Sequence, residues 1–189
     1  MNAGALTIAD NTVSGDLAAR DIHKNTYFNA RATTAMTKVV EQYIAETQAD
    51  KSLTDWTEKL EHYMSNVVNS DIRSLEEKLT AAGRQELINS ALLRKQSAYK
   101  AIMKQQGSRS AQTIYTFVMA EIVVNYEQAV LPLVQAGAAR EVVDAAMLEK
   151  VISPAFDMLE ENPLMLDKMD IQALVYFLAG NCYIRWDSC

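Results

Sequence analysis

Hydrophobic side chains recur every three to four residues over most of the chain, and this spacing constrains the fold more than any other feature. Over residues 31–48, for example, they follow the spacing i, i+3, i+4, i+7 and i+8, at Met36, Val39, Val40, Tyr43 and Ile44. Such a period places the apolar side chains on one face of an α-helix. Because the period returns in each later stretch, the sequence predicts an all-α fold.

Glycine and proline residues indicate where the helices end, since neither continues a regular helix well. We place the expected helix ends at Gly83, at Gly107, near Pro132, near Pro154 and at Gly180. Pro154 is also a candidate first residue of a further helix through Phe156 and Leu159. The longest predicted helix covers residues 84–106. We therefore predict a single-domain bundle of about six to eight helices over residues 31–189, with a short extended tail after the last helix.

The composition fits one domain with a core of its own. The chain has 189 residues, of which 49% are apolar, and a formal net charge of −6. A chain of this length buries roughly 70% of its unfolded surface, so it needs neither disulfides nor a metal to fold. The most apolar window, 113–134, is interrupted by Glu121, Asn125 and Glu127, so we interpret it as a buried core helix and not as a membrane span.

The net charge conceals an uneven distribution along the chain. Residues 84–110 carry six basic side chains and one acidic one, whereas residues 111–189 carry four basic and eleven acidic ones. An acidic chain is by default a poor nucleic-acid binder. The asymmetry means either that the two segments pair inside the fold or that they face a partner.

The basic helix has two kinds of cation. Lys95 falls in the middle of the apolar arc, where it either extends its ammonium toward water, pairs with a buried acid, or contacts a partner. The candidates for contact with an acidic surface or a phosphate backbone are Arg94, Lys100, Lys104 and Arg109. The alternative for these four is a solvated helix face.

Residues 1–30 show no helical period, and we interpret them as an irregular N-terminal arm that binds a partner. The candidate docking residues are Gly15, Asp16, Arg20, Asp21, Tyr27 and Phe28. Their polar pairs could instead form local turns. At the other end, Arg185 and Trp186 either close the core or anchor an interface, because Arg and Trp are common at interface centres.

The residues that carry catalysis are sparse. His23 and His62 have no Cys or His at ligand spacing, and the six glycines form no phosphate loop. Cys182, after a helix end, is expected to be a small buried side chain. With two cysteines and no basic, apolar leader, we expect a cytoplasmic protein that is not an enzyme and holds no cofactor or metal.

Two parts of the chain resemble proteins of prokaryotic defence. Residues 11–28 contain an S-G-D-x-x-x-R-D core similar to a signature near the start of many conflict-system proteins. Segments within 74–187, above all VYFLAGNCYIRWD over 175–187, look like the small helical subunit of ABC-ATPase three-component defence systems, the Lamassu type included. Position 183 is Tyr where this resemblance leads us to expect His, which argues against a shared metal or catalytic role there.

The resemblance implies a non-catalytic accessory subunit. Its partners would be an SMC-like ABC ATPase that senses DNA and a toxic effector such as a nuclease, with nucleic acid contacted indirectly and no membrane involved. Two alternatives stay open: a self-associating helical regulator or inhibitor, and an auxiliary subunit that contacts DNA through residues 84–110.

Overall fold

The structure is a computed structural model that describes residues 34–48, 57–65, 73–159 and 162–187. The regular elements among these residues are helices and helical turns, with no strand. In chain order the elements are α1 (Ala35–Gln48), α2 (Glu58–Met64), α3 (Leu75–Ala81), the 3-10 turn η1 (Gln85–Leu87), α4 (Ile88–Lys104), α5 (Arg109–Asn125), the π-helical turn η2 (Tyr126–Val130), α6 (Leu131–Gln135), α7 (Arg140–Ala146), the π-helical turn η3 (Met147–Ile152), α8 (Ser153–Asp157) and α9 (Lys168–Gly180). The predicted all-α bundle is confirmed. The arm over residues 1–30 lies outside the described residues.

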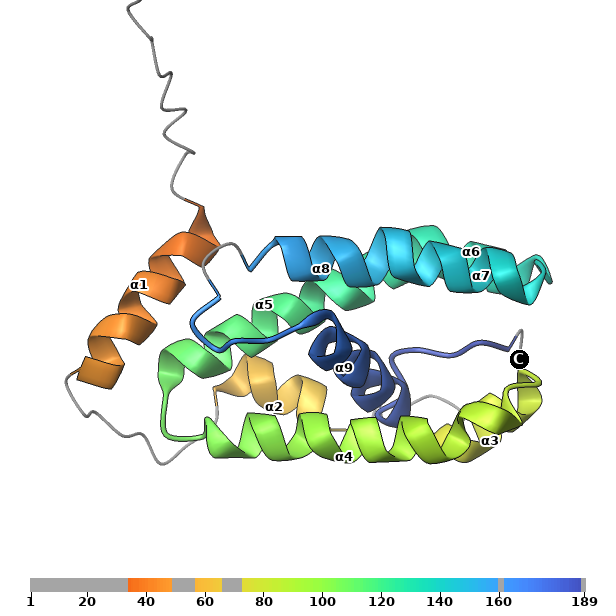
Figure 1. The fold of residues 1–189 in the computed structure, drawn as a ribbon, viewed down its shortest axis with the longest axis horizontal. Helices are drawn as coiled ribbons and strands as arrows, with labels where there is room; N and C mark the ends of the chain where they lie inside the picture. The colour runs from red at the N-terminus through yellow and green to blue at the C-terminus, as the bar shows by residue number, and fades with distance from the viewer. Residues whose placement is uncertain (1–33, 49–56, 66–72, 160–161, 188–189) are drawn as a thin grey trace, which may run out of the picture. The chain divides into compact units, whose positions relative to one another are not determined.

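Helix α9 lies at the centre of the core. It is apolar on almost every side, and eight of its thirteen residues are buried: Ile171, Ala173, Leu174, Val175, Tyr176, Phe177, Leu178 and Ala179. A helix that is apolar all round is stable only when other elements surround it. It packs mainly on α4 and also contacts α3, α5 and α8, and Figure 1 shows it between α4 and the pair formed by α7 and α8.

Two long helical stretches form an antiparallel hairpin, one from α5 through η2 to α6 and the other from α7 through η3 to α8 (Figure 1). Gly137, with φ of 68°, makes the turn between them, a conformation that glycine adopts without strain. Residues Arg109–Gln135 are long and apolar enough to cross a membrane by length and composition alone. In the fold, α5 buries nine residues and contacts α1, α2, α8 and α9. One third of the most apolar 18-residue window in this stretch is buried.

The predicted helix end at Pro132 is wrong, because helical structure continues past it. A helix does begin at Pro154 as predicted, since α8 has this proline in its first turn, but no break separates α8 from the helical turn before it. Each proline follows a π-helical turn: the Leu131 N–H donates to the Tyr126 carbonyl, and the Ser153 N–H donates to the Leu148 carbonyl. A proline ring clashes with the carbonyl four residues earlier in an ordinary helix. The π turn widens the helix just before each proline, which relieves this clash. The helix therefore continues past the proline.

Local capping interactions fix several other helix ends. Ser74 and Glu77 form a capping box at the start of α3, and Asp167 and Asp170 form another at the start of α9. Gly83 has φ of 66° and closes α3 as predicted, with the next N–H donating to the Leu79 carbonyl at 2.8 Å.

Lys95, the cation predicted within an apolar arc, is half-buried and lies against α9. A Cβ atom built on Gly180 would stand 2.6 Å from its Cε and Nζ atoms, so the stem of Lys95 occupies the space that a side chain at 180 would need. Lys95 makes no ion pair with a described residue. This is the arrangement of a long side chain that covers apolar surface with its methylenes.

Candidate interaction site beside the C-terminal tail

The tail after α9 is bound to the body of the domain by specific hydrogen bonds. The hydroxyl of Tyr126, a residue only 1% exposed, donates to the Arg185 carbonyl at 2.8 Å and accepts from the Arg185 N–H at 3.2 Å. Ile184 is buried at 1% exposure, and the Arg73 guanidinium donates to Asp187 Oδ2 at 2.6 Å. The tail therefore has a defined path although it forms no helix or strand.

The start of the tail contacts α2. The Asn181 side chain donates to the Tyr63 carbonyl at 2.8 Å, and the Tyr183 hydroxyl donates to the His62 carbonyl at 2.7 Å. The rings of His62, Tyr63 and Tyr183 lie within 5.3–5.6 Å of one another. Position 183, where His was expected, is thus a packing position against α2.

Trp186 lies half-buried at the edge of a pocket. Its ring centroid is 5.8 Å from that of Tyr176 on α9, and the guanidinium carbon of Arg84 stands 6.0 Å from it. The indole packs against Tyr176 of α9 and also lines the pocket, which agrees with the core-closing role. The role as an interface anchor stays a prediction. Arg185 is also half-buried but does not line the pocket.

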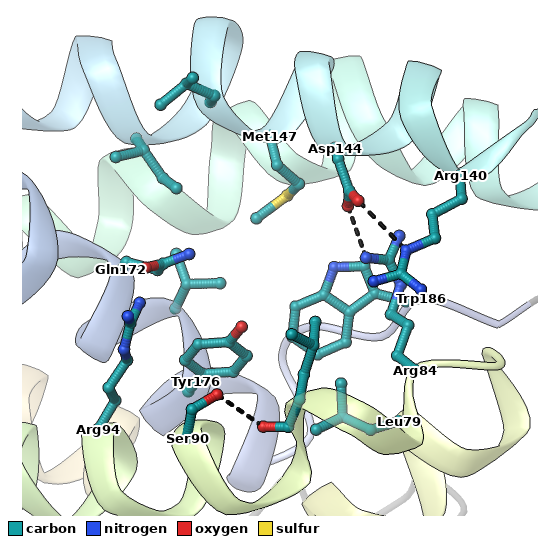
Figure 2. A pocket seen from close by; sticks show the side chains of 14 residues that line it. Leu79, Arg84, Ser90, Arg94, Arg140, Asp144, Met147, Gln172, Tyr176 and Trp186 are labelled. Carbon is teal, nitrogen blue, oxygen red and sulfur yellow. Dashed lines mark hydrogen bonds and ion pairs between the residues drawn. The ribbon is translucent and has the colours of Figure 1, made fainter.

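The pocket has a volume of about 440 Å³ and lies between α4, the α7–η3 stretch, α9 and Trp186 (Figure 2). Arg94 and Gln172 stand at one end, whereas Arg84, Arg140 and Asp144 gather around Trp186 at the other. The apolar part of its lining comes from Leu79, Leu87, Met147, Leu148, Ile152 and Val175. Sites that bind small groups commonly combine such an apolar lining with a few placed polar groups.

A chain of ion pairs crosses one end of the pocket. Arg84, only 5% exposed, donates to Asp144 Oδ1 at 2.5 Å, and Arg140 contacts the other oxygen of that carboxylate at 3.5 Å. Arg140 also pairs with Glu86. The bridge between Arg84 and Asp144 joins the basic segment to the acidic one, which is the internal pairing that the charge pattern left open. Of the six bases in 84–110, only Arg84 pairs with a described acid.

Arg94 differs from Arg84 because it has no carboxylate partner among the described residues. It is half-buried, and its charge acts on the nearby Tyr176 hydroxyl. Burial raises the pKa of the Tyr176 hydroxyl, and the guanidinium groups of Arg94 and Arg84 partly offset that rise. Arg94 therefore places an uncompensated positive charge next to an aromatic hydroxyl.

The other basic candidates lie elsewhere. Lys100, Lys104 and Arg109 are exposed and pair with no described acid. Arg109 borders a separate hollow together with Lys59. The structure thus brings Arg94 and Trp186 into one pocket but does not gather the four basic candidates there. The arm candidates Gly15, Asp16, Arg20, Asp21, Tyr27 and Phe28 lie outside the described residues.

The sequence interpretation missed Lys78, which is 3% exposed. Its ammonium donates to the Ala179 carbonyl at the end of α9 at 2.5 Å and also contacts the Cys182 thiol, and burial lowers the pKa of Lys78. Leu75, Lys78 and Leu79 have the spacing of residues on one helix face, and this pattern could have identified Lys78 as buried.

The expectation that Cys182 is buried is wrong, because this residue is only half-buried. Its backbone has φ of 70°.

No group of three or more metal-ligating side chains forms a candidate metal site among the described residues. The polar side chains of the pocket, mainly arginines, an amide and a tyrosine hydroxyl, are suited to binding an anion through hydrogen bonds.

Comparison with known proteins places this domain in a family. Residues 74–186 match the family model of C-terminal domain 9 of the ABC-three component (ABC-3C) systems. Comparison with curated proteins and with solved structures gave no match. The matched range spans more than half of the chain, from the start of α3 to Trp186, and includes every residue that lines the pocket. The chain therefore belongs to the family of C-terminal domain 9 of the ABC-three component systems.

Proposed function

We propose that this protein is a non-catalytic accessory subunit of a prokaryotic antiviral defence complex of the three-component type. In this role it links an SMC-like ABC ATPase to an effector such as a nuclease, in the cytoplasm. The observation that carries the proposal is the family match over residues 74–186, because a component of a three-component system works with partner subunits.

The surface beside the tail supports an interaction role. Trp, Tyr and Arg are the side chains most often found at the energetic centres of protein interfaces, and here Trp186, Tyr176 and Arg94 line one pocket. Leu148 at the same pocket is 54% exposed, so an apolar side chain also faces solvent there. A partner that covers this region would remove both apolar area and a half-buried cation from water.

The proposal is tested by co-expressing the affinity-tagged chain with the products of its neighbouring genes and measuring the mass of what is purified. We expect a complex that stays intact through size-exclusion chromatography, and a marked loss of partner in Trp186→Ala. A Leu93→Ala variant, changed at a side chain that is 69% exposed and lies outside the pocket, is the control.

Two results would contradict the proposal. Purification of a lone monomer despite co-expression would remove the adaptor role. A homodimer without other subunits would favour the alternative of a self-associating regulator. Thermal unfolding of Trp186→Ala must be measured alongside, so that loss of partner is separated from loss of fold.

A second function, auxiliary contact with DNA, is favoured by one observation: Lys100, Lys104 and Arg109 are exposed and pair with no described acid. Contact with phosphates predicts an affinity for duplex DNA that falls with salt, with a logarithmic slope of roughly 0.9 per phosphate neutralised. Reversing Lys100 and Lys104 to Glu then weakens binding and reduces the slope. An unchanged affinity removes this function.

A further inference from the structure

The charges that line the pocket do not balance. Arg84, Arg94 and Arg140 in the lining bring three positive charges. Two negative charges oppose them, one on Asp144 in the lining and one on Glu86, which lies outside the lining but pairs with Arg140. One positive charge is left over within a chain whose net charge is −6. A ligand that carries a single negative charge would complete the balance.

The geometry assigns this excess charge to Arg94. Asp144 forms ion pairs with Arg84 and Arg140 at the end of the pocket near Trp186, whereas Arg94 lies at the opposite end (Figure 2). Arg84 also has an unsatisfied hydrogen-bond donor, because its Nε–H is buried and has no partner among the described residues. The pocket therefore has more hydrogen-bond donors on cations than acceptors to satisfy them.

The polar groups near Arg94 favour a planar anion. A guanidinium binds a carboxylate through two parallel N–H donors, an arrangement that ammonium groups cannot make. Gln172 and the Tyr176 hydroxyl lie near the same end and offer further donors. The lining also includes apolar side chains, of which Leu148 is exposed to solvent.

We infer that this pocket binds a short segment of a partner subunit in which an Asp or Glu side chain lies next to an apolar one. The carboxylate contacts Arg94, and the apolar neighbour packs against Trp186, Leu148 and the remaining apolar lining. This inference rests on the proposed function, since it names the chemistry by which a subunit of the complex is bound.

The same charges disfavour phosphate and nucleic acid as the occupant. A phosphate monoester carries nearly two negative charges near neutral pH, whereas a single positive charge is uncompensated here. The Asp144 side chain, 46% exposed in the pocket wall, repels a polyanion that passes along the groove. A nucleic-acid backbone is also polar and charged, so it gains nothing by packing against the apolar lining.

The experiment measures the affinity of the purified full chain for its co-purified partners in four forms: the natural chain, Arg94→Gln, Arg94→Lys and Lys38→Gln. Lys38 is the control, because it is exposed on α1, lies outside the pocket and loses the same charge. We expect Arg94→Gln to weaken binding by roughly tenfold or more, since it leaves a desolvated carboxylate without its cation. Arg94→Lys retains part of the affinity, and Lys38→Gln matches the natural chain.

The outcomes separate the inference from the proposed function. If the natural chain binds its partners and Arg94→Gln binds as well as Lys38→Gln, the inference is wrong and the proposed function stands. If the natural chain binds no partner, both the inference and the proposed function are wrong. Displacement of the partner by ATP or by a short DNA duplex, lost in Arg94→Gln, would show a phosphate site and overturn the inference. Because Arg94 pairs with no described acid, its variants should have the same melting temperature as the natural chain.

Discussion

Replacing Tyr126 by Phe tests whether the tail is held by the contacts described above. The change removes one oxygen atom and leaves the buried ring in place, so little packing is lost. The lost hydroxyl donates to the Arg185 carbonyl at 2.8 Å and accepts from its N–H at 3.2 Å. With about 0.5–1.5 kcal/mol for each hydrogen bond, the free energy of unfolding should fall by about 1–3 kcal/mol.

The assay is thermal and urea unfolding followed by far-ultraviolet circular dichroism. For a chain of this size, 1 kcal/mol corresponds to about 2–4 °C in the melting temperature, so we expect a decrease of several degrees. Tyr99→Phe is the control, since Tyr99 is 45% exposed and its hydroxyl makes no hydrogen bond with a described residue. Equal melting temperatures for Tyr126→Phe and Tyr99→Phe would refute the account of the tail.

Three further predictions follow from the core, a helix cap and a buried tyrosine. Ile114→Ala, at a fully buried position of α5, should lower the free energy of unfolding by about 2–5 kcal/mol in urea titrations, whereas Leu93→Ala should change it by less than about 0.5 kcal/mol. Ser74→Ala removes one half of the capping box of α3 and should reduce the stability by about 1 kcal/mol; no effect would mean that the cap is not formed in solution. Burial raises the pKa of Tyr115 to about 12 from 10.0, and because the unfolded chain then loses this proton first, stability should fall as the pH rises from 10.0 toward 12. Tyr115→Phe should flatten that decline by about 3 kcal/mol, and an unchanged pH profile would contradict the assignment.

The hydrophobic period was sufficient to predict the helices, because amphipathic spacing reports on which face meets the core. It could not predict that the helices continue through Pro132 and Pro154. The π turns that make room for these prolines are a change in backbone hydrogen bonding, and no spacing of hydrophobic residues in the sequence indicates it. Lys78 shows a related limit. A lysine on an apolar face is expected to reach water, yet here the end of α9 supplies a carbonyl that its buried ammonium can bind.

The candidate site could be predicted only in part. Arg94 and Trp186 were named from residue type, for two different reasons, but nothing in the sequence indicates that α4 and the tail meet at one pocket. Arg84 and Asp144, which pair in the ion-pair network, are sixty residues apart in the sequence and meet only in the tertiary fold. Long-range pairing of this kind depends on tertiary packing and not on local spacing.

Site-specific photo-crosslinking in the native complex tests the central claim most directly, because it asks whether a partner subunit covers this pocket. A benzophenone amino acid replaces Leu148, at the pocket, in one variant and Leu93, outside it, in the other; both side chains are exposed. The account predicts a crosslink from position 148 to a partner subunit, at a segment that contains Asp or Glu, and none from position 93. Crosslinks from position 93 alone, or equal crosslinking from both, would contradict it.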